Sequence, residues 1–212
     1  NQYQVSLVPK NVTHEIMTFN LSLSAADLIL LLPEIFLTIW LCVILALDFS
    51  VKRITHQQLG HLSIGGLGIT ALMLLVFDQN GTTGALFKNM YVLDHMAIFF
   101  KILIVGASAL VLFISIDYVR EFRFFKGEYY FMVLMSAIGM MFMASSNDLL
   151  SVFVTLEFST FGFYVLVAYL RDDQRSSEAG LKFFILGVFA AGLLAYGISL
   201  VYGETGTLVF SE

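Results

Sequence analysis

Six long apolar stretches constrain the fold of this chain more than any other feature of its sequence. Each is roughly 17 to 25 residues long, which is the length that a helix needs to cross about 30 Å of hydrocarbon. None alternates apolar and polar residues over about ten positions, as the strands of a membrane barrel do. The sequence therefore predicts an all-α polytopic membrane protein. Its six transmembrane helices are expected over residues 28–47, 59–77, 92–116, 129–145, 149–170 and 179–202.

Composition agrees with a chain that lies mostly in a bilayer. Of its 212 residues, 58% are apolar and 13% are charged, whereas soluble domains average about 45–50% and about 25%. The formal net charge of −5 includes no run of like charge, which excludes a nucleic-acid partner and leaves lipid as the expected surroundings. We expect residues 27–212 to form the transmembrane domain and residues 1–26 to form a surface segment, with Asn20, Ser22 and Ser24 as candidate helix caps. No removable signal peptide is predicted.

The sequence offers no set of residues that would hold a metal or a redox cofactor. Its single cysteine, Cys42, lies inside an apolar stretch, so neither a disulfide nor a cysteine-ligated cluster is predicted. Haem would need histidines that face one another from the middle of helices. The four histidines lie instead near the ends of the predicted helices or outside them: His14, His56, His61 and His95. We therefore expect no cofactor and no metal in this chain.

The loops predict an orientation in the membrane, because basic residues gather on the cytoplasmic side. The loops after the first, third and fifth helices hold seven basic residues, and the opposite side holds two, Lys10 and Lys88. The seven are Lys52, Arg53, Arg120, Arg123, Lys126, Arg171 and Arg175. Both termini are therefore predicted to face away from the cytoplasm.

Ionisable residues inside the helices are the candidate functional residues, because a charge near the bilayer centre costs on the order of 2.5–3.5 kcal/mol on insertion scales. Glu157 is the deepest, near the middle of the fifth predicted helix, and its short side chain cannot reach the interface. Thr160 and Tyr164 follow on the same helix face, where their hydroxyls could hold water or relay a proton. The alternative is a protonated or hydrogen-bonded glutamic acid that only joins helices.

Lys182 is the second candidate, and we expect it about one turn into the sixth helix, after the polar hairpin at 171–178. If the last two helices are antiparallel, Lys182 lies level with roughly residue 165, about 12 Å from Glu157 along the helix axis. That spacing excludes a direct ion pair and leaves a water-bridged couple. The alternative is a lysine whose ammonium reaches the cytoplasmic interface.

Lys101 is a secondary candidate for a proton path, and in the third predicted helix it follows Asp94 by seven residues, on the same face and about 10 Å further along the axis. Its structural alternative is neutralisation of a charge on another helix, and this reading is the stronger one. Glu34 follows Pro33 in the first predicted helix, and we interpret it mainly as a polar contact at a kink.

Several motifs together resemble a known family. They are LLPE at 31–34, the stretch from Gly127 to Tyr169 with its central LEFST, SSEAGLKFFILG at 176–187 and SLVYGETG at 199–206. The combination is similar to subunit N of proton-translocating NADH:quinone oxidoreductase, respiratory complex I, called subunit 2 in mitochondria. The likeness is close over residues 91–206 and looser over the first two helices.

The resemblance implies an antiporter-like subunit that couples distant quinone reduction to proton translocation without a cofactor of its own. FMN, iron–sulfur clusters and quinone would be bound elsewhere in the complex, and the partners would be its other membrane subunits. The family's proton-path glutamate and lysine correspond to Glu157 and Lys182. The resemblance implies two inverted repeats of five helices plus flanking helices, about fourteen helices in total. Six helices therefore imply the N-terminal part of a longer subunit, or a split gene.

Alternatives to this function remain open at the level of sequence. They are a subunit of a related sodium/proton antiporter or membrane-bound hydrogenase, and a structural scaffold in which every buried charge joins helices. We expect an integral membrane protein of a bacterial inner membrane, with the mitochondrial inner membrane and the thylakoid as alternatives.

Overall fold

A computed structural model describes residues 25–50, 55–121, 127–170 and 172–210 of the chain. Its elements, in chain order, are α1 (Ala25–Leu30), α2 (Leu32–Ser50), α3 (His56–Gln79), β1 (Gly84–Leu86), β2 (Tyr91–Leu93), α4 (His95–Glu121), α5 (Glu128–Ala144), α6 (Leu149–Val167) and α7 (Gln174–Thr205). The predicted surface segment at 1–26 lies outside the described residues, with its three candidate caps, except that 25 and 26 begin α1.

Each predicted membrane helix corresponds to a helix in the structure. Within the described residues, five helices are long and apolar enough to cross a membrane, namely α2, α3, α4, α6 and α7. The remaining one, α5, is apolar but has 17 residues, a length of about 25 Å. The mostly helical membrane fold is therefore confirmed, while the number of six transmembrane helices stays a prediction.

Local sequence explains where several helices begin. The Asp148 side chain accepts a hydrogen bond from the Ser151 backbone N–H at 2.9 Å, which caps α6, and Asp173 accepts one from the Arg175 N–H at 2.9 Å, which caps α7. Because α7 starts at Gln174, the second half of the predicted hairpin at 171–178 is helical. Lys182 consequently lies more than two turns into its helix, and the expected depth of one turn is wrong.

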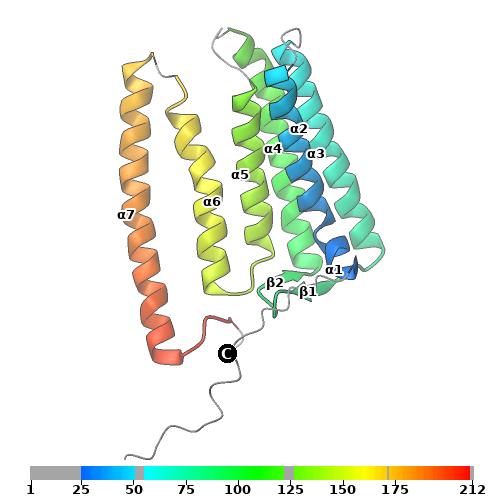
Figure 1. Ribbon diagram of the computed structural model, residues 1–212, viewed down its shortest axis with the longest axis vertical. Helices are drawn as coiled ribbons and strands as arrows, with labels where there is room; N and C mark the ends of the chain where they lie inside the picture. The colour runs from blue at the N-terminus through cyan, green and yellow to red at the C-terminus, as the bar shows by residue number, and fades with distance from the viewer. Residues whose placement is uncertain (1–24, 51–54, 122–126, 171, 211–212) are drawn as a thin grey trace, which may run out of the picture.

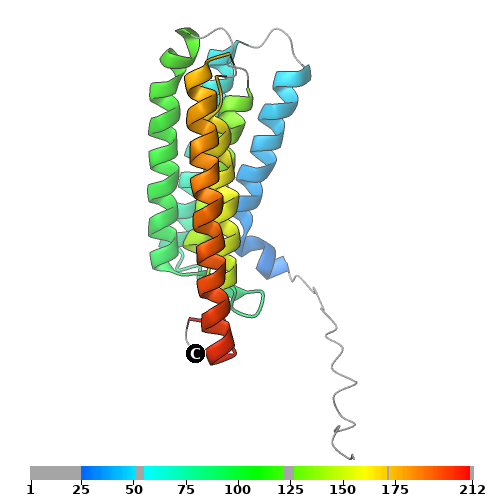
Figure 2. The same ribbon diagram turned by 90° about the vertical axis from the view of Figure 1, so that its left-hand side faces the viewer.

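The helices stand side by side in an arrangement that runs from α7 through α6 and α5 to a group formed by α2, α3 and α4 (Figure 1). Viewed from the α7 side, α4 and α2 lie on opposite sides of α5, α6 and α7 (Figure 2). The fully buried apolar side chains come from α2 to α5, for example Leu37, Leu67, Val105 and Leu134. By contrast, α7 packs mainly against α6, and among its described residues Gly180, near its start, is the buried one.

One close approach fixes the packing of α2 on α3. The Trp40 indole N–H donates to the Leu62 carbonyl at 3.0 Å, and the indole covers Gly66 so closely that a Cβ there would lie 2.2 Å from Trp40 Cδ1. Because no side chain fits between the two helices at this point, glycine is required at Gly66.

A short β-hairpin joins α3 to α4, and the sequence did not predict it. Its strands pair antiparallel, with Gly84 opposite Leu93 and Leu86 opposite Tyr91. The hairpin is attached to the α5–α6 connection, because the Val92 N–H donates to the Ser145 carbonyl at 2.8 Å. The third predicted helix therefore begins too early, since 92 and 93 belong to β2 and α4 starts at His95. The hairpin, α1 and the α5–α6 connection lie at one end of the molecule, opposite the start of α7 (Figure 1).

Candidate functional site

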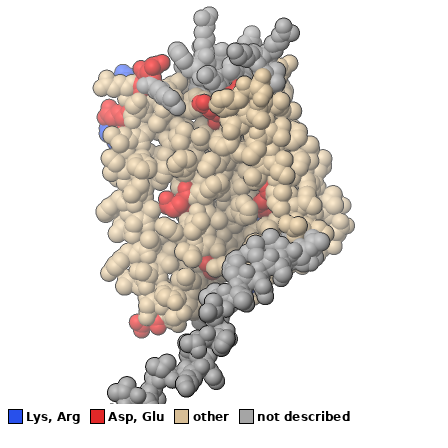
Figure 3. Space-filling model, viewed as in Figure 1, with Lys and Arg blue, Asp and Glu red and all other residues tan. Residues whose placement is uncertain are grey.

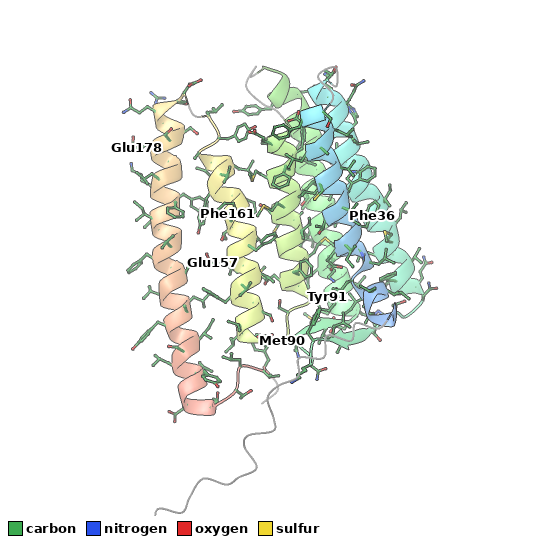
Figure 4. The ribbon with its side chains drawn as sticks, in the orientation of Figure 1. Phe36, Met90, Tyr91, Glu157, Phe161 and Glu178 are labelled. Atoms are coloured by element: carbon green, nitrogen blue, oxygen red, sulfur yellow. The ribbon has the colours of Figure 1, made fainter. Side chains whose placement is uncertain are left out.

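Glu157 lies near the middle of α6, eight residues from its first residue, as the sequence predicts. Its side chain is half-buried, and within the described part of the chain its carboxylate has no hydrogen-bond or ion-pair partner. Figure 4 shows Glu157 at mid-height on α6, far from either end of the helices. On the face viewed in Figure 3, charged atoms gather toward the two ends of the molecule, with only a few acidic atoms at mid-height.

The two hydroxyls predicted to share the Glu157 face behave differently. Thr160 donates to the backbone carbonyl of Glu157 at 3.1 Å, so its hydroxyl satisfies the helix itself. Tyr164 faces α7, where its ring packs edge-on against Phe183, with centroids 5.0 Å apart, and where it covers Gly187. Because Glu157 lies two turns before Tyr164, its side chain is also on the α7 side of α6.

Lys182 is paired on the surface of α7 instead of facing Glu157. Its ammonium lies 2.6 Å from Glu178 Oε1, one turn earlier, and the two side chains are 70% and 58% exposed. The helix register agrees with the predicted one, because Gly180 packs against Ala168. Lys182 is therefore level with about residue 166, roughly 14 Å along α6 from Glu157. The structure does not bring these two candidates together, and Figure 4 shows Glu178 near the start of α7, well away from Glu157.

Lys101 and Glu34 form the one fully buried ion pair among the described residues. Lys101 Nζ lies 2.5 Å from Glu34 Oε1, and both side chains are 0% exposed. Glu34 is on the first turn of α2, after the single residue that separates α2 from α1. Its placement agrees with a polar contact at a kink beside Pro33, and the pair agrees with the structural alternative for Lys101, which neutralises a charge on another helix.

Tyr91 completes this buried cluster from the hairpin. Its hydroxyl accepts a hydrogen bond from Lys101 Nζ at 2.8 Å and donates to Glu34 Oε1 at 3.2 Å. Burial, and then the negative charge of Glu34, raise the pKa of the Tyr91 phenol, while the neighbouring Ser145 hydroxyl acts in the opposite direction. The phenol therefore stays protonated between the ammonium and the carboxylate.

One member of this cluster and one pairing were missed in the sequence. Tyr91 was not singled out, and Glu34 was noted as a polar contact but not identified as the partner of Lys101. A usable signal was present: Glu34 and Lys101 are each charged residues near the same predicted end of an apolar helix, and such charges are generally paired. Asp94, expected inside the helix, precedes it and caps it by accepting from the Ala97 N–H at 2.7 Å.

Comparison with known proteins gives the class first. Residues 146–212 match the family model described as the transmembrane region of NADH:quinone oxidoreductase and Mrp antiporters. With its apolar helices, the chain is an integral membrane protein of the antiporter-like kind. A curated relative from Dehalococcoides mccartyi, named NADH-quinone oxidoreductase subunit N, is 39% identical over 177 residues, which are 84% of this chain and 36% of the relative. The resemblance to subunit N is confirmed.

Solved structures agree with this assignment. A chain of respiratory complex I from Thermus thermophilus with bound aureothin superposes with a TM-score of 0.71 at 27% identity, over 85% of this chain and 38% of that one. A chain of the membrane-bound sulfane sulfur reductase, an archaeal respiratory membrane complex, superposes with a TM-score of 0.62 at 19% identity, over 87% and 29%, and shares the fold alone. The chain thus spans less than two fifths of the length of these relatives.

Proposed function

We propose that this chain is a segment of an antiporter-like membrane subunit that couples NADH:quinone oxidation and reduction to proton translocation. The observation that carries the proposal is Glu157, a half-buried carboxylate in the middle of α6 with no partner among the described residues. An acidic group at membrane depth is costly unless it is paired, hydrated or titrating. Proton transfer past Glu157 accounts for a carboxylate at this depth better than a purely structural role does, because within the described ranges no helix contact uses that carboxylate.

Lys182 is the second group on the proposed path, together with Thr160 and Tyr164. In the described structure Lys182 pairs with Glu178, and its long side chain can turn toward α6 instead. Exchange between these two partners would move positive charge relative to Glu157 and so bias the protonation of that carboxylate. Tyr164 lies on the α7 side of α6, where its hydroxyl faces Gly187. We propose that this hydroxyl connects Glu157 with Lys182.

The surroundings follow from the same proposal. The exposed apolar length of α7 and the greater length of the relatives support further helices beside α7, with other membrane subunits as partners. We propose a bacterial inner membrane as the location of the chain. We also propose six transmembrane helices, with α5 as one of them, because α5 packs against α2, α4 and α6. No cofactor is assigned to this chain.

The test is Glu157→Gln in the full-length subunit within its complex. Glutamine keeps the size of the side chain but cannot carry the charge, so we expect assembly within about 1 kcal/mol of wild type and a lower proton-to-electron ratio. Glu204→Gln, which alters an exposed carboxylate near the end of α7, is the matched control and should pump normally. An unchanged ratio in Glu157→Gln would remove this residue from the path, and loss of assembly before loss of pumping would favour the scaffold role.

Lys182→Ala should lower pumping less than Glu157→Gln does. The comparison with Glu178→Gln is informative here, because a lysine that serves only the surface pair would give the same result when either partner is removed. Equal and negligible effects of the two variants would assign Lys182 to the surface of α7.

An ion-antiporter subunit is the second candidate, since the matching family model covers both quinone oxidoreductases and Mrp antiporters. The identity to subunit N favours the oxidoreductase. Purification with a quinone-site subunit and a flavin module would support it, whereas purification with antiporter-like chains alone would support the second candidate.

A further inference from the structure

The buried cluster of Glu34, Tyr91 and Lys101 lies beside a surface pocket at the hairpin end of the molecule. The pocket has a volume of about 330 Å³, and its lining includes Asp94, Ser145 and Asn147. Its wall also includes Val92, the chain neighbour of Tyr91, and Phe100, the chain neighbour of Lys101. The pocket wall is therefore formed in part by the chain neighbours of two members of the cluster.

Two polar atoms between the pocket and the ion pair lack a protein partner. Within the described part of the chain, Ser145 Oγ and Glu34 Oε2 are both buried and make no hydrogen bond. Buried polar groups are nearly always satisfied, and where the protein supplies no partner, water does. Ser145 is 2% exposed, lines the pocket and lies beside the hairpin, because its carbonyl accepts the N–H of Val92, the residue after Tyr91, at 2.8 Å.

We propose that this pocket is a water-filled access site through which the Glu34–Lys101 pair exchanges protons with the solvent at the hairpin end, by way of Ser145 and Tyr91. Nothing in this route uses Glu157 or Lys182, which lie on α6 and α7.

The proton balance of one transfer is simple. A hydrated proton in the pocket passes to the Ser145 hydroxyl, whose own proton passes through the water that we propose beside Ser145 to the Tyr91 oxygen. Tyr91 in turn gives its proton to Glu34 Oε1, along the hydrogen bond that it already makes. One proton enters, Glu34 becomes a neutral carboxylic acid, and Lys101 keeps its charge.

The titratable groups that face the cluster are few. Glu34 comes from α2, Tyr91 from β2 and Lys101 from α4. Asp94 lines the pocket, and its negative charge interacts with the Lys101 ammonium at longer range than that of Glu34 does. The end of α5 contributes Phe142, which packs edge-on against Tyr91 with centroids 6.3 Å apart, and the unpartnered Ser145. The Tyr91 hydroxyl also lies 3.4 Å from the Leu30 carbonyl, and Ser145 is the hydroxyl of this group that lines the pocket.

Water access is tested by thiol labelling of the full-length subunit in its complex, in membrane vesicles of both orientations and in a Cys42→Ser background. Ser145→Cys is compared with Ser136→Cys, because Ser136 is equally buried, 1% exposed, and also lacks a partner, but does not line the pocket. We expect a small charged thiol reagent to label the Ser145→Cys protein at least about tenfold faster, and only from the hairpin side. Equal rates, or labelling from the other side, would overturn the proposal.

Ala97→Cys repeats the measurement on the α4 wall of the pocket if the Ser145→Cys subunit does not assemble, with the buried Ala137→Cys as its control. The relay rests on the proposed function and is tested by Tyr91→Phe, which removes the hydroxyl and keeps the ring. We expect a lower proton-to-electron ratio, and a wild-type ratio would overturn the relay. Labelling does not depend on pumping, so it can fail or succeed whatever Glu157→Gln shows.

Discussion

Removal of Lys101 should be one of the most costly single substitutions in this chain. The Lys101→Met substitution keeps an unbranched side chain of similar length but leaves Glu34 without its counter-charge at a site that is 0% exposed. At 2.5 Å and an effective dielectric constant of about 20, the two charges attract each other by about 7 kcal/mol. Desolvation of both ions offsets most of that attraction.

The expected loss follows from the carboxylate that remains. Breaking a buried pair by removing one partner typically costs about 3–5 kcal/mol. A carboxylate that is buried without a counter-charge becomes protonated, which removes the buried charge. Protonation of an ordinary glutamate side chain costs about 4 kcal/mol at pH 7 and about 1 kcal/mol at pH 5. The destabilisation of Lys101→Met relative to wild type should therefore be about 3–5 kcal/mol at pH 7 and should shrink as the pH falls to 5.

A double-mutant cycle measures this directly. The free energy of unfolding is obtained by titrating the full-length subunit in mixed micelles with a denaturing detergent, for wild type, Lys101→Met, Glu34→Leu and the double variant. Because the double variant leaves neither charge buried, it should recover most of the loss of either single variant, with a coupling of at least about 2 kcal/mol. Losses that simply add, or a single-variant loss below about 1 kcal/mol, would refute a tightly coupled buried pair.

Three further predictions, with four substitutions, concern other parts of the structure and use the same unfolding measurement. Gly180→Ala places a Cβ 2.4 Å from the Ala168 Cβ and should lower the free energy of unfolding by about 1–3 kcal/mol. Gly192→Ala is its control: the space around Gly192 is open, so this substitution should be neutral or stabilising by up to about 1 kcal/mol. Equal effects of the two substitutions would contradict the α6–α7 packing. Asp148→Ala removes the cap of α6 and should cost about 1 kcal/mol; no loss would show that the cap is dispensable. Burial raises the pKa of Tyr91, so the unfolded chain loses the phenol proton first and the free energy of unfolding falls as the pH rises above about 10. Tyr91→Phe should make this fall less steep. An unchanged slope between about pH 9 and 11 would contradict the burial of the phenol.

Hydropathy was sufficient to locate the helices because the thickness of a bilayer fixes the length of an apolar stretch. The predicted helix at 59–77 lies within α3, and the one at 149–170 overlaps almost all of α6. The β-hairpin escaped prediction for an equally physical reason. Its strands have three residues each, too few for an alternating pattern to emerge, and their pairing depends on the α5–α6 connection, which is distant in sequence.

The level of Glu157 in α6 and of Lys182 relative to α6 could be predicted, but the start of α7 and the direction of a side chain could not. Glu157 lies where counting residues placed it, and the level of Lys182 relative to α6 agrees within about one residue. The partner of Lys182 was not foreseen, because the start of α7 was expected after Glu178, and only a helical Glu178 lies one turn from Lys182. Likewise, the rotation of α2 and α4 that brings Glu34 against Lys101 is set by packing across the whole bundle, and no local pattern records it.

The two charge clusters should therefore be separable by experiment. Glu157 has no described partner, so neutralising it removes a titrating group without leaving a buried charge behind, and pumping should fail before stability does. Lys101 and Glu34 satisfy each other, so removing one charge should destabilise the subunit first and hide any effect on transport. The double variant of Lys101→Met and Glu34→Leu avoids this masking, because it restores an uncharged core. If the pair only holds α2 against α4, the double variant should assemble and pump normally. If it exchanges protons with the hairpin-side pocket, the double variant should assemble and pump with a lower proton-to-electron ratio.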